Sequence, residues 1–139
     1  MNQLSGATQI KKNMQQNPKL TSEQKDVLFN KATEAPFSGA LLHNDESGAY
    51  TCANCGAELF MSDTKFDSGS GWPSFYEPKA EDAVDLVADE SHGMVRTEVV
   101  CKSCGGHLGH LFDDAFDQLT GQRFCINSAS LNFKTKKVT

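Results

Sequence analysis

The sequence of 139 residues lacks long apolar runs and an excess of positive charge. No stretch approaches the ~20 apolar residues of a membrane span, and residues 1–19 hold no hydrophobic segment of the signal-peptide type. We therefore expect a soluble, cytoplasmic protein that has no membrane partner. The formal net charge is −5. Because protein modules that bind nucleic acid normally carry a basic face, this negative charge argues against a nucleic-acid partner.

Cysteine is scarce outside two short motifs. Four of the five cysteines lie in C-x-x-C-G sequences, at residues 52–56 and 101–105. The two sulfurs of one such motif can converge on a single ion, and the following glycine lets the backbone turn tightly beneath it. All-sulfur tetrahedral sites favour zinc or iron, and zinc is the more usual metal in a cytosolic protein. The sequence therefore predicts one zinc per chain, bound by Cys52, Cys55, Cys101 and Cys104.

The predicted zinc is structural, because four cysteines fill the coordination shell and a catalytic zinc keeps one position open. A pair of disulfides is a weaker interpretation, since cysteines of a cytosolic protein are usually reduced. A thioredoxin-type C-x-x-C would require a strand-to-helix setting and a single motif.

Two rival functional classes use similar cysteines. A zinc-binding interaction module would keep both motifs and would need no reactive thiol at Cys125. A zinc deaminase or another hydrolase would need an open metal position and a glutamate in an H-x-E arrangement. That arrangement is absent around His43, His92, His107 and His110.

The composition changes at about residue 20. Residues 1–19 are rich in Asn, Gln and Lys and predict a flexible polar arm, whereas residues 20–137 predict one domain. Thr21 and Gln24 resemble a capping box, which predicts a short helix that ends before Pro36. Beyond this helix, turn residues separate short runs of β-forming residues, so we expect a mainly β fold.

One predicted hairpin bears on the metal site. Residues 84–88 and 94–101 flank the turn-rich segment 89–93. This pattern predicts two antiparallel strands that deliver the second C-x-x-C motif at a strand end.

Cys125 stands apart from both motifs. Alternation along residues 123–127 places Phe124 and Ile126 on one face of a strand, with Arg123, Cys125 and Asn127 on the other. A lone cysteine is often buried and inert. A neighbouring guanidinium instead favours the thiolate, so the polar face supports a reactive thiol.

Three segments closely resemble the methionine-R-sulfoxide reductase B family. They are residues 66–75 (FDSGSGWPSF), 107–114 (HLGHLFDD) and 123–128 (RFCINS), and the resemblance runs from about Leu20 to Lys134. It implies a compact, barrel-like fold of two antiparallel β-sheets and a structural zinc far from the active site. It also implies reduction of the R epimer of methionine sulfoxide, free or in proteins, as a repair of oxidative damage.

The resemblance also assigns roles to the residues. A sulfoxide sulfur is a poor electrophile until its oxygen takes a proton, so the site needs a soft nucleophile beside an acid. Cys125 fits the nucleophile, which becomes a sulfenic acid as methionine leaves. The family pattern gives His110 a catalytic role and gives His107 and Asn127 contacts to the reacting substrate. Without that pattern, a structural role is the more usual one for either histidine.

Aromatic and charged residues complete the predicted site. Trp72, the only tryptophan, could place its indole face against the electron-poor methyl group of the substrate, where cation–π gains are ~0.5–2 kcal/mol. A half-buried aromatic at a loop base is the alternative. Phe75 and Phe112 are candidates for an apolar wall, although core packing explains them equally well. Arg123 and Asp114 match family positions that support the substrate site.

One position departs from the family pattern. Many members carry a resolving cysteine where this chain has Ser70, and the N-terminal arm has no cysteine to substitute. Recycling is therefore expected to use an external thiol, which could be thioredoxin, glutaredoxin with glutathione, or a small dithiol. We expect the protein to act as a monomer.

Overall fold

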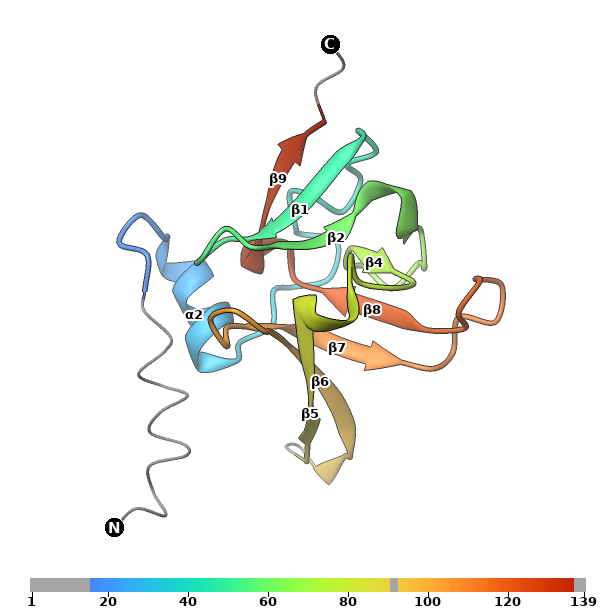
Figure 1. The fold of residues 1–139 in the computed structure, drawn as a ribbon. Coiled ribbons are helices and arrows are strands. Elements are labelled where there is room, and N and C mark those ends of the chain that lie inside the picture. Colours follow the sequence, from blue (N-terminus) through green and yellow to red (C-terminus); the bar gives the residue numbers. More distant parts are fainter. Residues whose placement is uncertain (1–15, 91–92, 137–139) are drawn as a thin grey trace.

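Two antiparallel β-sheets form the framework of the described chain (Figure 1). The computed structural model describes residues 16–90 and 93–136. The smaller sheet has the strand order β2-β1-β9 and the larger one β3-β4-β8-β7-β6-β5. The strands of the smaller sheet are β1 (Gly48–Cys52), β2 (Glu58–Met61) and β9 (Leu131–Thr135). Those of the larger sheet are β3 (Lys65–Phe66), β4 (Ser74–Phe75), β5 (Val84–Asp89), β6 (Arg96–Cys101), β7 (His107–Phe112) and β8 (Arg123–Ile126).

The helical elements are short. They are the α-helix α2 (Ser22–Asn30) and the 3₁₀ turns η2 (Ser62–Thr64), η3 (Glu81–Ala83) and η5 (Ser128–Ser130). The predicted mainly β fold with two antiparallel sheets is thus confirmed. The strands of the described chain form no closed barrel, so the likeness to a barrel is limited to the compact packing of the two sheets.

Helix α2 begins as its sequence predicts. The Thr21 side chain accepts a hydrogen bond from the Gln24 backbone, and the Gln24 side chain accepts one from the Thr21 backbone, which completes the capping box. Val27 and Leu28 are buried, and the helix packs against β7 and η5. Its C-cap, Lys31, has the left-handed conformation with φ 59°.

The core fills the space between the two sheets. The rings of Phe60 on β2 and Phe75 on β4 stack with centroids 4.5 Å apart, and Tyr50 on β1 meets Phe75 edge-on at 5.0 Å. Phe124 on β8 contacts Phe60 from the other side of the interface. These rings are almost wholly buried, so they bind the smaller sheet to the middle of the larger one.

The predicted hairpin is formed by β5 and β6. These strands pair from Val84 opposite Cys101 to Asp89 opposite Arg96, although residues 91–92 of its loop lie outside the described residues. Most of the predicted N-terminal arm, residues 1–15, also lies outside them. The described end of that arm contacts the domain, because the Asn17 backbone N–H donates a hydrogen bond to Asn54 Oδ1 at 2.7 Å. Within the described residues, no helix is long and apolar enough to cross a membrane.

Candidate active site and metal centre

The four motif cysteines meet in one cluster. Their sulfur atoms all lie within 4.8 Å of one another, and the Cys52–Cys104 and Cys55–Cys101 pairs are each separated by 3.6 Å. Four sulfurs around a tetrahedral zinc with bonds of about 2.3 Å would be about 3.8 Å apart. The same separation is much longer than a disulfide bond of about 2.05 Å. The cluster therefore fits a tetrahedral metal ion and contains no disulfide.

The chain reaches this cluster through two tight turns. Gly56 and Gly105 follow the second cysteine of each motif and have φ values of 83° and 81°, a region that favours glycine. Cys52 ends β1 in the smaller sheet and Cys101 ends β6 in the larger one. A bound ion would consequently cross-link the two sheets.

The close packing of the thiols shifts their pKa values. Hydrogen bonding with neighbouring thiols raises the pKa of Cys52 and of Cys101, while hydrogen bonding from Cys101 and Cys52 lowers the pKa of Cys104. One thiolate is thus stabilised by its protonated neighbours. A divalent cation would displace the remaining protons, because thiolates are the metal-binding form.

Cys125 lies on β8 with the predicted alternation. Phe124 and Ile126 are buried, whereas Arg123 and Cys125 are half-buried on the opposite face. That face opens into a cavity of about 220 Å³. The cavity is lined by Thr33, Ser70, Trp72, Arg96, Gly109, His110, Phe112, Arg123, Cys125 and Asn127.

Strand pairing places specific residues on either side of Cys125. His110 on β7 and Ser74 on β4 are its register partners, so both project from the same face as the thiol. Gly109 lets β7 approach closely, because a Cβ there would lie 2.0 Å from the Cys125 carbonyl oxygen. The sheet therefore holds an imidazole opposite the thiol.

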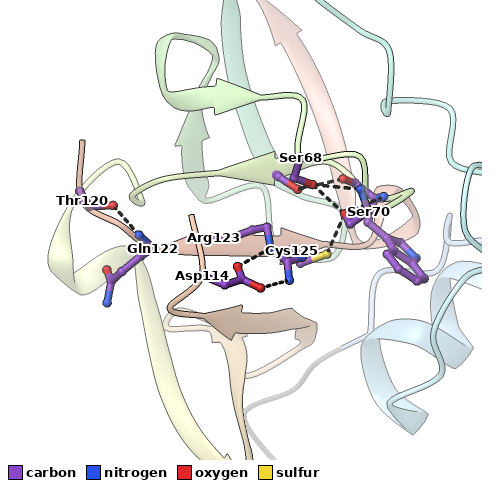
Figure 2. A network of polar contacts seen from close by, with 9 residues as sticks. Ser68, Ser70, Asp114, Thr120, Gln122, Arg123 and Cys125 are labelled. Carbon is purple, nitrogen blue, oxygen red and sulfur yellow. Dashed lines mark hydrogen bonds and ion pairs between the residues drawn. The ribbon is translucent and has the colours of Figure 1, made fainter. Parts of the chain in front are cut away.

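Serine hydroxyls also lie close to the Cys125 thiol (Figure 2). Ser70 Oγ lies 3.6 Å from Cys125 Sγ, and Ser68 Oγ lies 2.8 Å from Ser70 Oγ and 2.7 Å from Ser74 Oγ. Burial raises the pKa of the Cys125 thiol, and the opposing effects of Ser70 and Arg123 do not cancel it. Arg123 acts in the direction expected from the sequence, but desolvation is stronger, so the resting thiol holds its proton.

Arg123 is held by two contacts at the cavity edge. Its Nε and Nη2 donate to the two carboxylate oxygens of Asp114 at 2.9 and 3.0 Å, as Figure 2 shows. Its guanidinium carbon lies 4.3 Å from the centroid of the Phe112 ring. Asp114 does not line the cavity, and its geometry supports an indirect role through the orientation of Arg123.

The two predicted histidines occupy different environments. His110 lines the cavity, and its Nε2 lies 2.7 Å from Asp89 Oδ2. His107 is only 2% exposed and does not line the cavity, and its Nδ1 lies 2.7 Å from Glu98 Oε2. Burial lowers the pKa of His110, which the hydrogen bond to Asp89 partly opposes. His110 is therefore neutral near pH 7 when the cavity is free.

Glu34 connects two lining residues, although its sequence position gave no sign of this. Its carbonyl oxygen accepts a hydrogen bond from Trp72 Nε1, and its N–H donates to Asn127 Oδ1, each at 3.0 Å. Its buried carboxylate accepts the backbone N–H groups of Ser128 and Ala129 at 2.9 Å. Burial raises the pKa of this carboxyl group. The backbone of Glu34 thus holds both the Trp72 indole and the Asn127 amide, which line the same cavity.

The cavity brings together most, but not all, of the predicted site residues. Cys125, His110, Asn127, Trp72, Phe112 and Arg123 line it. Phe75 instead lies in the core, because its strand register pairs it with the buried Phe124 and not with Cys125. The sequence prediction missed Thr33, Arg96 and Gly109 in the lining, and Glu34, Asp89 and Glu98 behind it. These residues become recognisable only when distant strands are paired.

Known proteins resemble this chain over most of its described length. The SelR domain model matches residues 20–135. The chain is 60% identical over 118 residues to the peptide methionine sulfoxide reductase MsrB of Methanosarcina barkeri, covering 85% of this chain and 82% of that protein. The protein of the same name from Leptospira interrogans is 58% identical over 115 residues, or 83% of this chain and 87% of that one. The one from Bradyrhizobium diazoefficiens is 54% identical over 127 residues, which are 91% of each chain.

Proposed function

Because this chain belongs to the SelR-domain, methionine-R-sulfoxide reductase B family, we propose that it reduces the R epimer of methionine sulfoxide through a cysteine sulfenic acid. The substrate is expected in oxidised proteins and also as the free amino acid. One observation carries the proposal. Cys125 is set apart from the four clustered cysteines and lines a cavity together with His110 and Trp72.

The proposed chemistry balances without another cofactor in the cavity. The Cys125 sulfur attacks the sulfur of the protonated sulfoxide to form an S–S bond, and the S–O bond breaks with loss of hydroxide. The hydroxide then attacks the Cys125 sulfur and breaks the S–S bond, which leaves Cys125 as a sulfenic acid and releases the thioether. The substrate sulfur gains two electrons and leaves as the thioether, and the cysteine sulfur loses two. The proton of the thiol ends on the transferred oxygen, so sulfoxide and thiol become thioether and sulfenic acid.

Proton transfer in this step is assigned to His110. The resting thiol is protonated and the imidazole is neutral, since burial disfavours the charged form of both groups. His110 is the register partner of Cys125, so it can take the thiol proton and pass it to the sulfoxide oxygen as the S–O bond weakens. An imidazolium with a lowered pKa is a stronger acid, which suits this second transfer.

The remaining lining residues suit the substrate methyl and oxygen. The hydrogen bond from Trp72 Nε1 to Glu34 fixes the indole at the cavity wall, where it can face a developing sulfonium. Phe112 adds an apolar surface beside Arg123. Asn127 Nδ2 donates to the Leu108 carbonyl at 3.0 Å, so the amide is held in one orientation at the cavity.

Regeneration requires a thiol from outside the chain. Ser70 Oγ lies 3.6 Å from Cys125 Sγ, and a serine cannot form a disulfide. Two equivalents of thiol convert the sulfenic acid to thiol, a disulfide and water. Thioredoxin, or glutaredoxin with glutathione, is the proposed donor. The four clustered cysteines are proposed to hold one structural zinc, whose role is to stabilise the fold.

A stereochemical assay tests the proposed reaction. The purified protein is mixed with dithiothreitol and with each epimer of methionine sulfoxide in separate reactions, and methionine is quantified by chromatography. Only the R epimer should be reduced. Equal reduction of both epimers, or none of the R epimer, would contradict the proposal.

A further inference from the structure

Two buried carboxylates lie behind the histidines of β7. Asp89, at the end of β5, is 4% exposed, and Glu98, on β6, is 6% exposed. Each contacts one imidazole at 2.7 Å, Asp89 at Nε2 of His110 and Glu98 at Nδ1 of His107. An ionised carboxylate only accepts hydrogen bonds, so each facing ring nitrogen must carry a hydrogen.

A single lysine joins the two carboxylates. Lys31 Nζ lies 3.2 Å from Glu98 Oε1 and 3.8 Å from Asp89 Oδ1. Burial alone would raise the pKa of Glu98, but His107 and Lys31 outweigh burial and hold that pKa below its usual value. On the other side of Asp89, Arg96 Nη2 lies 3.6 Å from Oδ2. Glu98 is therefore held in the ionised form, and Asp89 lies between two cationic side chains.

The backbone of Lys31 is unusual for a lysine. It terminates α2 with φ 59°, a position at which helices most often have glycine, or sometimes asparagine. Neither of those residues could reach Asp89 and Glu98 with a positive charge. A non-glycine residue kept in this conformation is consistent with a functional requirement for its side chain.

We propose that Asp89 and Glu98 are positioning residues that fix the tautomers of His110 and His107, and that Lys31 keeps both carboxylates in place. The effect of these residues on turnover rests on the proposed reaction, whereas the tautomers do not. With Nε2–H of His110 bound to Asp89, Nδ1 is the nitrogen free to exchange a proton with Cys125 or the sulfoxide oxygen. With Nδ1–H of His107 bound to Glu98, Nε2 becomes its acceptor, and this atom is buried without a hydrogen-bond partner in the described chain.

Charged and titratable groups surround His110 from every neighbouring element. Asp89 faces it from β5, Arg96 and Glu98 from β6, His107 from its own strand, and Arg123 and Cys125 from β8, while Lys31 lies beyond the carboxylates. Asp89 is the anion in direct contact with the ring. Its removal should therefore lower the pKa of His110 further and release the ring from one tautomer.

The tautomers can be measured without any substitution. Long-range ¹H–¹⁵N NMR of the full chain in the absence of substrate should show the neutral His110 ring with hydrogen on Nε2 and the His107 ring with hydrogen on Nδ1. Hydrogen on the opposite nitrogen of His110 would overturn the proposal. This readout stands whether or not the protein reduces methionine sulfoxide, so it separates failure of this inference from failure of the proposed reaction.

Asp89→Asn tests positioning against a matched control, Asp85→Asn. Asp85 is an exposed carboxylate on the same strand whose partner is Lys102. Asp89→Asn should lower kcat by about 10- to 100-fold with little change in KM and move the His110 titration to lower pH. Asp85→Asn should alter neither. If the two variants titrate and turn over alike, Asp89 is not a positioning residue.

Lys31→Gly isolates the role of the ammonium, because glycine suits the left-handed backbone at this position. The variant should fold as well as the parent but lose most of its kcat, whereas Lys31→Arg should retain activity. Full kcat in Lys31→Gly would remove Lys31 from the proposal.

Discussion

The hydroxyl of Ser70 lies 3.6 Å from the sulfur of Cys125, and the two residues are 55 positions apart in the chain. The Gly-rich loop 69–71 therefore directs the Ser70 side chain toward the Cys125 thiol. A thiol at position 70 would be close enough to act as a resolving group. Under the proposed reaction, a serine at this point leaves the oxidised Cys125 without an adjacent thiol after the first turnover.

Ser70→Cys should convert the oxidised enzyme from a sulfenic acid to a disulfide. Disulfides form when Cα atoms are about 4.4–6.8 Å apart, a spacing consistent with the present side-chain contact. After one turnover without reductant, mass spectrometry should find a bond between residues 70 and 125. Thioredoxin-coupled turnover should also become faster, because the reductant then meets a disulfide.

The unsubstituted protein is the control for that experiment. One turnover should yield one methionine per chain, a dimedone adduct at Cys125 and unchanged metal content. A disulfide between Cys125 and one of the clustered cysteines in this sample would show that the metal site resolves the intermediate and that Ser70 is irrelevant.

Cys125→Ser should abolish turnover while leaving the fold and the metal content intact. A hydroxyl is a far weaker nucleophile than a thiol at neutral pH, and the half-buried position on β8 tolerates the smaller atom. Methionine production, circular dichroism and metal analysis check the three expectations. Appreciable residual activity would remove Cys125 from the role of nucleophile.

Cys104→Ser should cost most of the bound metal and much of the stability. Apparent zinc-binding energies in small modules are about 10–16 kcal/mol at neutral pH, so the loss of one ligand has a large effect. Metal analysis and thermal unfolding measure it, with Cys125→Ser as the matched cysteine control. Purified protein without zinc or iron, or a variant with the full metal content and melting temperature of the parent, would contradict the assignment.

Alkylation of Cys125 should have a midpoint above the usual cysteine pKa of about 8.5, because burial raises the pKa of this thiol. Arg123 favours the thiolate, so Arg123→Met should move the midpoint to higher pH, whereas Arg123→Lys should move it less. The measurement is the rate of iodoacetamide labelling against pH, followed by peptide mass spectrometry. A shift of the Arg123→Met midpoint to lower pH would reverse the assigned sign.

Local features were predictable from the sequence because they depend on near neighbours. The capping box of Thr21 and Gln24 involves residues three apart, and the β5–β6 hairpin joins adjacent strands. The alternation around Cys125 follows from the period of a strand. The four motif cysteines could be grouped because their chemistry restricts their partners.

Long-range pairing decides the features that the sequence did not predict. Glu34 contacts Asn127 across 93 positions, and no local pattern marks a glutamate as buried. His107 and His110 lie in one motif, but the environment of each depends on which carboxylate β5 or β6 supplies. Phe75 was equally compatible with core and cavity until the β4–β8 register placed it opposite Phe124.

If an external thiol recycles the protein as proposed, the kind of cross-link at the cysteine cluster also has a kinetic consequence. A metal held by Cys52 and Cys104 closes a loop across 52 positions, so it removes chain entropy from the unfolded state in the way that a disulfide does. A disulfide at this place would compete with the sulfenic acid for the reductant, and each exchange would open the fold. Under the proposed recycling, a metal cross-link would instead let the same reductant regenerate Cys125 while the two sheets stay joined.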